Sequence, residues 1–255
     1  QEGVQEVSNG SFSQEGSELV VNGDFATDSD WTKLQGTTIS GGVANINSTN
    51  AYNTILSQTL DVIEVGKTYK IKFSIGGNPL DFKVGLGSLS QGSFSDVITS
   101  SGDYEIDITQ TDGAAPSSIA FLTWSTAIQT FTIDNVSVKE VGQDWILTSG
   151  ASISNDKLNV NANAYDYFAR QLNVSTIGKT YKVSVDVEVQ SGRIILYLAD
   201  TGAFEVIDTS GSYTFYIVAD GTQIRFRAFD TAFIGSITNI SVKEVGQNWT
   251  LGSGW

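Results

Sequence analysis

The feature that most constrains this chain is a stretch of thirteen residues that occurs twice. Residues 133–145 read IDNVSVKEVGQDW, and residues 237–249 read ITNISVKEVGQNW. The second copy begins 104 residues after the first (237 − 133), a spacing equal to the length of one small domain. Each copy ends in a tryptophan that opens a new pattern, as Trp31 does earlier in the chain. The repeat therefore predicts two tandem modules with the same fold.

The repeat also sets the domain boundaries that we expect. Four segments are predicted: a seam or the end of a preceding module over 1–18, a first module over 19–141, a second module over 142–246, and the start of a further repeat or a C-terminal tail over 247–255. The seam is inferred because residues 4–7 (VQEV) resemble residues 138–141 (VKEV). The alternative for residues 1–18 is an arm that pairs with the sheet edge of a neighbouring molecule. Both ends of the chain look cut from a longer array.

Short segments of alternating polarity follow one another between turn signals in both modules. In residues 69–75 (YKIKFSI) every second residue is apolar, as expected for a half-buried antiparallel strand. GKTY at residues 66–69 returns at residues 178–181, so the strands of the two modules correspond. No stretch has a helical period. The pattern predicts an all-β chain of two tandem antiparallel β-sandwich modules of the jelly-roll type.

The alternation slips inside both copies of the thirteen-residue repeat. An odd step follows Ile133 in one copy and Ile237 in the other. A β-bulge at Asp134-Asn135 and at Thr238-Asn239 would restore the buried face. Bulges re-aim side chains near binding sites, but they also curve sheets, and sheet curvature is the simpler interpretation here.

The residue types that are missing exclude several classes of chemistry. The chain has no Cys, no His and no Met, which removes disulfides, thiol nucleophiles, imidazole bases and the usual zinc sites. A net charge of −14 argues against binding nucleic acid, and no apolar run is long enough for a membrane helix. Glu105, Glu188 and Glu205 are available, but no feature pairs them across a cleft as glycoside hydrolysis requires. We predict a protein that is not an enzyme, has no catalytic cofactor and inserts into no membrane.

Three short motifs resemble a known family of sugar-binding domains. NGDF at residues 22–25, GKTY at residues 66–69 and IDNVSV at residues 133–138 resemble the jelly-roll carbohydrate-binding modules of the family 4, 9 and 22 type. Divergent relatives of these modules occur in tandem in bacteriophage tail and virion-surface proteins. The resemblance covers residues 19–141, whereas residues 142–246 lack NGDF and match less fully.

The resemblance implies a function in adhesion. The expected partner is a surface polysaccharide, bound without catalysis by an array in which neighbouring copies or repeats of the chain meet. The expected location is extracellular or on a virion surface, as in a phage tail fibre or a decoration protein. The alternative is a purely structural repeat without a sugar site, acting as a spacer of a phage fibre, a virion decoration or an extracellular filament.

Sugars bind such modules by stacking on aromatic rings, while amides and charges contact their hydroxyl groups. In the first module the candidates for carbohydrate binding are Tyr52, Gln58, Lys83 and Trp124. Gly85 and Gly87 share the Lys83 face and would leave room for a ligand or another backbone. The alternative is that a loop or a neighbouring module covers Trp124.

In the second module the candidates combine aromatic rings with arginine. They are Tyr165, Tyr167, Tyr197, Arg225, Arg227 and Phe229. Because a guanidinium group binds carboxylate or sulfate groups through two parallel hydrogen bonds, this set predicts an acidic sugar. The alternative is that these arginines pair with acidic groups of the first module or of a neighbouring molecule.

The resemblance also implies one structural Ca²⁺ in the first module. Asp24 of NGDF and Asp134 of IDNVSV stand at the matching positions, and backbone carbonyls and water can complete the six to eight oxygen ligands that Ca²⁺ prefers. The second module has Thr238 in place of Asp134 and no counterpart of Asp24, so we expect no calcium there. The alternative is that Asp24 closes a turn and Asp134 caps the bulge.

Overall fold

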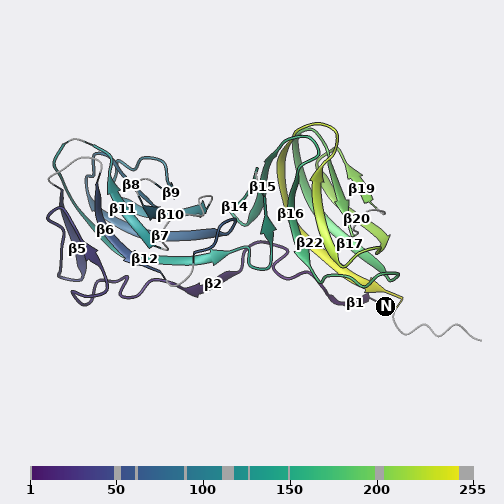
Figure 1. Cartoon of the computed structure of the whole chain (residues 1–255), viewed down its shortest axis with the longest axis horizontal. Helices are drawn as coiled ribbons and strands as arrows, with labels where there is room; N and C mark the ends of the chain where they lie inside the picture. The colour runs from purple at the N-terminus through teal and green to yellow at the C-terminus, as the bar shows by residue number, and fades with distance from the viewer. Residues whose placement is uncertain are drawn as a thin grey trace, which may run out of the picture. The chain divides into compact units, whose positions relative to one another are not determined.

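The computed structural model describes residues 2–48, 53–60, 63–88, 91–110, 118–125, 127–148, 150–198 and 204–246. The chain divides into two compact units (Figure 1). The first module is Glu15–Val141, and the second module combines Gln1–Gln14 with Gly142–Trp255. The described residues form strands, and no helix among them could span a lipid bilayer.

The first module consists of two antiparallel sheets. Its six-stranded sheet has the order β10-β7-β12-β5-β4, with β2 also paired to β12. These strands are β2 (Glu15–Glu18), β4 (Thr38–Ser40), β5 (Val43–Ser48), β7 (Thr68–Gly77), β10 (Gly102–Thr109) and β12 (Gln129–Val141). Its five-stranded sheet has the order β3-β6-β11-β8-β9. These strands are β3 (Thr32–Lys33), β6 (Thr54–Thr59), β8 (Phe82–Ser88), β9 (Gln91–Phe94) and β11 (Ser118–Thr123).

The second module repeats this arrangement strand for strand. Its six-stranded sheet has the order β14-β15-β22-β17-β20, with β1 also paired to β22. These strands are β1 (Glu2–Gln5), β14 (Ala151–Ser154), β15 (Lys157–Ala162), β17 (Thr180–Ser191), β20 (Gly211–Val218) and β22 (Phe233–Val245). Its five-stranded sheet has the order β13-β16-β21-β18-β19. These strands are β13 (Ile146–Leu147), β16 (Tyr167–Leu172), β18 (Ile194–Tyr197), β19 (Phe204–Ile207) and β21 (Gln223–Ala228).

In each module the two sheets pack face to face. In the first module Phe73 of β7 meets Phe121 of β11 edge to face, with ring centroids 5.5 Å apart, inside one core to which both sheets contribute. In the second module Phe168 of β16 stacks on Phe233 of β22 at 6.2 Å. The predicted fold class, two antiparallel β-sandwich modules with equivalent strand orders, is therefore confirmed.

Both predicted β-bulges are present. The register of β12 against β7 shifts between Asp134 and Ser137, and β22 shifts against β17 at the equivalent place. The extra residue is Asn135 in one module and Asn239 in the other, each with φ of 53°. Asparagine tolerates this left-handed conformation better than most residues, which explains its presence in both bulges.

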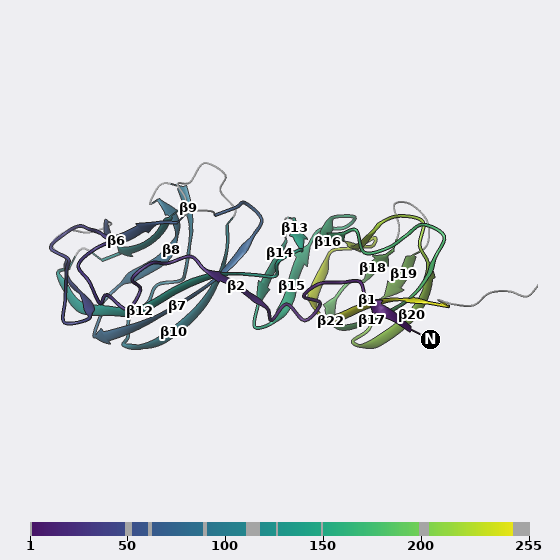
Figure 2. The same cartoon turned by 90° about the horizontal axis from the view of Figure 1, so that it is seen from below.

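The N-terminal residues differ from the prediction. We call residues 1–13 segment A and residues 14–26 segment B. Segment A belongs to the second module, where β1 pairs with β22, and segment B begins the first module, where β2 pairs with β12 (Figures 1 and 2). The second module therefore does contain a counterpart of NGDF, namely Asn9-Gly10-Ser11-Phe12, which precedes the whole first module in the sequence.

The GKTY motif has a structural role in both modules. The hydroxyl of Tyr69 accepts a hydrogen bond from the backbone N–H of Glu64 at 2.8 Å, and that of Tyr181 accepts one from Thr176 at 2.8 Å. Both rings are buried, and burial raises the pKa of the Tyr69 hydroxyl. Each tyrosine thus ties the preceding loop to the core.

We expect the Glu15→Gln variant to lower the melting temperature of the first module by a few degrees at pH 7. The Glu15 carboxylate accepts hydrogen bonds from Lys72 and Lys139, each at 3.1 Å, and these bonds lower its pKa below the ordinary 4.5. Because the pKa of Glu15 is lower in the folded state than in the unfolded chain, the ionised carboxylate stabilises the fold by about 0.5–1 kcal/mol at pH values above the ordinary pKa. This stabilisation is lost as the pH falls through the pKa of the folded state.

Thermal melts at several pH values measure this effect. The difference between wild type and Glu15→Gln should close as the pH falls below the ordinary 4.5 and through the lowered pKa of the folded state, where the wild-type carboxylate also becomes neutral. The Asp96→Asn variant removes an exposed carboxylate of the same module and is the matched control. A difference that persisted unchanged to pH 3 would show that charge is not the cause.

Candidate functional site

The arginines and tyrosines predicted as candidates lie on the outer face of the five-stranded sheet of the second module. In β21 Ile224, Phe226 and Ala228 are buried, while the two arginines between them point the other way. Arg225 lies directly opposite Tyr197 of β18, and Arg227 lies opposite Tyr167 of β16. Residues directly opposite each other on neighbouring strands share one face of a sheet, so the strand register brings these four together.

The two guanidinium groups pack against the tyrosine rings. The Arg225 guanidinium lies 4.8 Å from the ring centroid of Tyr167 and 5.5 Å from that of Tyr197. The Arg227 guanidinium lies 5.4 Å from Tyr167, 5.6 Å from Tyr197 and 5.8 Å from Tyr165. Each cation therefore meets several rings, and these contacts hold both arginines at the surface.

Three of the aromatic rings on this face are open to solvent. Tyr165 is 60% exposed, Tyr167 is 41% exposed and Phe204 is 46% exposed. Tyr197 is buried beneath them, and this burial raises the pKa of its hydroxyl, although the charges of Arg227 and Arg225 act in the opposite direction. A buried tyrosine under exposed rings makes the face a fixed platform instead of a set of separate side chains.

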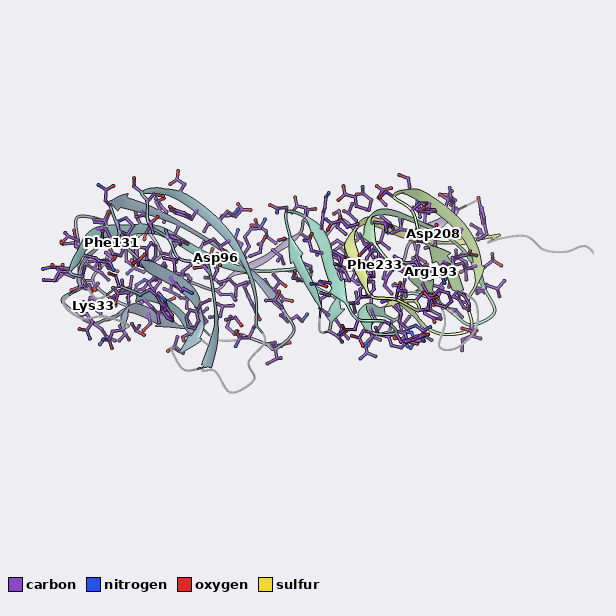
Figure 3. The ribbon with its side chains drawn as sticks, turned by 90° about the horizontal axis from the view of Figure 1, so that it is seen from above. Lys33, Asp96, Phe131, Arg193, Asp208 and Phe233 are labelled. Carbon is purple, nitrogen blue, oxygen red and sulfur yellow. The ribbon has the colours of Figure 1, made fainter. Side chains whose placement is uncertain are left out.

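Phe229 continues this face at one end. Its ring lies 6.5 Å from that of Phe204, and the guanidinium of Arg193 covers it at 4.7 Å. Arg193 also pairs through two nitrogens with Asp230, and Figure 3 shows its position in the second module. This arginine is neutralised by its partner, so it serves mainly to hold Phe229 in place.

The face carries the cationic side chains of Arg170, Arg225 and Arg227 although the chain as a whole is acidic. Within the described ranges, neither Arg227 nor Arg170 forms an ion pair with a carboxylate. Among these residues, no acidic group of this chain therefore neutralises Arg227, and the alternative of pairing with a neighbouring molecule stays a prediction. A cation over aromatic rings can attract an anionic group and place an apolar sugar face on the rings.

Sequence reasoning missed two members of this face. Arg170 of β16 lies directly opposite Arg225, and Phe204 of β19 lies directly opposite Tyr197 with its ring 5.7 Å away. Both assignments depend on which residues are paired across neighbouring strands. The only signal available from the sequence was the alternation within β16 and β19, which does not give their register.

The first module has different residues at the same positions. Ala120 and Leu122 of β11 correspond to Arg225 and Arg227 of β21. They hold the same register against β8 as the two arginines hold against β18, the equivalent strand. Gly85 corresponds to Tyr197. The first module therefore lacks the arginine and tyrosine platform, although its fold is equivalent.

The candidates of the first module are dispersed. Trp124 is 41% exposed, and the Lys83 ammonium lies 4.5 Å from its ring centroid, so these two do meet at the surface. Tyr52 lies outside the described residues. A side chain at Gly85 would meet the ring of Phe94 at 2.3 Å, so the expected room for a ligand there is already filled.

Gln58 is a structural residue and not a surface amide. It is 5% exposed, donates to the carbonyl of Val21 at 2.7 Å and accepts from the N–H of Val21 at 2.9 Å. Gln171 makes the same pair of bonds with Ser8 in the second module. The prediction for Gln58 is corrected on this ground: its amide is used to hold segment B.

Both aspartates of the calcium hypothesis make local hydrogen bonds. Asp24 accepts from the N–H of Ala26 at 3.3 Å, and Asp134 accepts from the N–H of Asn135 at 2.7 Å. In the described part of the chain, no group of three or more acidic residues is arranged so that it could hold a metal ion. In the second module Ser11 occupies the position that Asp24 has in the first. Thr238 occupies the position of Asp134.

Calcium in the first module stays a prediction, and chelation is its test. If Ca²⁺ binds only the folded state, removing it lowers the melting temperature of the first module by several degrees. The second module, with Ser11 and Thr238, should melt at the same temperature with and without chelator. If the melting curve of the first module were the same at saturating calcium as in chelator, the prediction of a bound Ca²⁺ would be wrong.

Comparisons with known proteins give the following likenesses. No protein-family profile and no curated protein matches the chain. The N-terminal tandem of two CBM22 domains of Paenibacillus barcinonensis Xyn10C covers 91% of this chain and 98% of its own length, with 13% identity and a TM-score of 0.33. A Paenibacillus xanthan lyase covers 86% of this chain with 18% identity and a TM-score of 0.27, and this chain spans 25% of that protein. The fold class given above depends on the strand order and not on these likenesses.

Proposed function

We propose that the second module binds an acidic polysaccharide on the outer face of its five-stranded sheet. The observation that carries this proposal is the packing of the Arg225 and Arg227 guanidinium groups among Tyr165, Tyr167 and Tyr197. The exposed rings offer flat apolar surfaces for sugar C–H groups. The guanidinium groups supply paired donors for carboxylate or sulfate substituents.

The two modules have different functions in this proposal, because their outer sheet faces carry different residues at equivalent positions. The first module has Ala120, Leu122 and Gly85 where the second has its arginines and Tyr197. In this proposal the first module is a spacer that presents the second, and the chain acts as a non-catalytic adhesion protein. Such polymers are displayed on cell surfaces, so the proposal places the chain in an extracellular or virion-surface setting.

The double variant Arg225→Gln and Arg227→Gln is expected to lose binding to acidic polymers. Each charge-assisted hydrogen bond contributes about 1.5–3 kcal/mol, so the affinity should fall at least about tenfold for each arginine. Affinity electrophoresis in gels that contain polygalacturonate, sulfated dextran or uncharged dextran measures this. We expect retardation of the wild type by one of the two acidic polymers, no retardation of the double variant, and less retardation of the wild type at high salt.

Matched variants separate binding from folding. Lys83→Gln removes a cation over the Trp124 ring in the first module, and it should leave retardation unchanged. The double variant must melt within a few degrees of the wild type for its result to count. A wild-type chain that passes through all three gels without retardation would favour the structural-spacer alternative.

A further inference from the structure

Segments A and B are two copies of one sequence. Aligned with an offset of thirteen residues, they are identical at seven positions, which read Gln, Glu, Gly, Val, Asn, Gly and Phe in order. Segment B is continuous with the module that it completes. Segment A is separated from the rest of its module by the whole first module, Glu15–Val141.

The backbone contacts of the two segments are equivalent. The N–H of Ile240 donates to the carbonyl of Gly10 at 2.9 Å, and the N–H of Val136 donates to that of Gly23 at 2.8 Å. Both donors belong to the β-bulges. In the other direction, the backbone N–H of Glu6 donates to the carbonyl of Val242 at 2.8 Å. In the first module, the N–H of Leu19 donates to the carbonyl of Val138 at 2.9 Å. Each segment is thus added as an extra strand next to a bulge.

The side chains repeat these equivalences. The Trp145 indole N–H donates to the carbonyl of Asn9 at 3.2 Å, and that of Trp31 donates to Asn22 at 3.0 Å. Phe12 packs on Trp145 with ring centroids 5.3 Å apart, as Phe25 packs on Trp31 at 5.2 Å. Both phenylalanines are 1% exposed, so each segment closes the core of its module.

Charged and polar groups complete the recognition. Glu2 pairs with Lys182 and Lys243, as Glu15 pairs with Lys72 and Lys139. The Gln5 side chain accepts from the N–H of Val242 at 3.0 Å, and Glu18 accepts from that of Val138 at 2.8 Å. Gln5 and Glu18 both act as acceptors towards these N–H groups, and Gln5 also donates from its Nε2 to the carbonyl of Ile240 at 3.2 Å, which Glu18 cannot do.

We propose that the second module is a binding site for segment A in trans, so that one copy of the chain binds another by exchanging this segment. The contacts above are those of a short peptide added to a sheet edge, and they are the same whichever chain supplies the peptide. Segment B shares most of these recognition groups, so the site accepts a peptide of that sequence more weakly. This inference concerns assembly and is independent of the polysaccharide proposal.

Two full-length variants test the exchange. Gly10→Val spoils segment A, because a side chain at this position would meet the carbonyl oxygen of Ile240 at 2.0 Å, and it leaves the site intact. Trp145→Ala damages the site and leaves segment A intact. Each variant alone should sediment as a monomer. An equimolar mixture should contain a heterodimer, because the second chain donates segment A to the first.

A peptide gives an independent measurement. Adding a synthetic peptide of residues 1–13 to the Gly10→Val chain should raise the melting temperature of its second module in a dose-dependent way. A peptide of residues 14–26 should do so only at a higher concentration, since Glu18 cannot donate the hydrogen bond that Gln5 gives to Ile240. The 1–13 peptide that itself carries Gly10→Val should have no effect. Variants that remain monomeric when mixed, or a 1–13 peptide no better than its Gly10→Val form, would overturn the proposal.

Discussion

The Gly23→Ala variant is expected to destabilise the first module strongly and to leave the stability of the second module unchanged. A Cβ atom at this position would lie 2.0 Å from the carbonyl oxygen of Val136, and that oxygen belongs to a bulge that cannot retreat without breaking its ladder. We expect a loss of about 3 kcal/mol, a large share of the stability of a domain of this size. Gly10→Ala should destabilise the second module by a similar amount while leaving it folded, because its Cβ would lie 2.0 Å from the oxygen of Ile240.

Hydrogen exchange measured by mass spectrometry identifies which module opens in each variant. Gly41→Ala is the control, because Gly41 has φ of 67° but no heavy atom within 4 Å of the added Cβ. It should cost only about 1 kcal/mol, from backbone strain alone. If Gly41→Ala were as damaging as Gly23→Ala, the close approach to Val136 would not be the cause.

Trp145→Ala has the second large expected effect. Trp145 is fully buried, packs on Phe12 and on Phe226 of β21, and donates its indole N–H to Asn9. Removing a buried aromatic side chain of this size costs about 3–5 kcal/mol. Segment A should lose its protection from hydrogen exchange before the rest of the second module does, because two of its residues contact this ring.

Denaturant unfolding of two further variants tests that interpretation. Trp145→Phe keeps a ring in the core but loses the bond to Asn9, so it should cost less than the alanine variant. Trp124→Ala removes an exposed tryptophan and should change stability by less than about 0.5 kcal/mol. Full protection of segment A in Trp145→Ala would mean that the strand pairing alone holds it.

The fold class could be predicted because its signals are local. The alternation in residues 69–75 and the slip after Ile133 each depend on a few neighbouring residues, and the structure has a strand at one and a bulge at the other. The placement of segment A could not be predicted in the same way. Its partner strand, β22, begins at Phe233, and a pairing over such a separation leaves no periodic pattern in the sequence.

In the candidate site, too, the features that depend on local sequence could be predicted and those that depend on strand pairing could not. The alternation of Ile224, Phe226 and Ala228 with the arginines indicated that Arg225 and Arg227 share an outer face, and the structure has them there. Arg170 and Phe204 were missed because cross-strand register is invisible in a single sequence. Gln58 was misinterpreted because a polar residue in a strand looks the same whether it faces solvent or a buried backbone.

The position of segment A ahead of the first module has a consequence during translation. Gly10 is synthesised 230 residues before Ile240, its bonding partner (240 − 10), which at roughly 5–20 residues per second is a wait of about 10–50 s. The first module can fold within that interval and must choose between two nearly equivalent segments. Both segments are already released when Val136 is synthesised, and the loop that segment B closes is only thirteen residues shorter, an entropic difference of about 0.1 kcal/mol. The residues in which the two segments differ, such as Gln5 and Glu18, must therefore determine which segment the first module receives, while segment A waits until β22 is made.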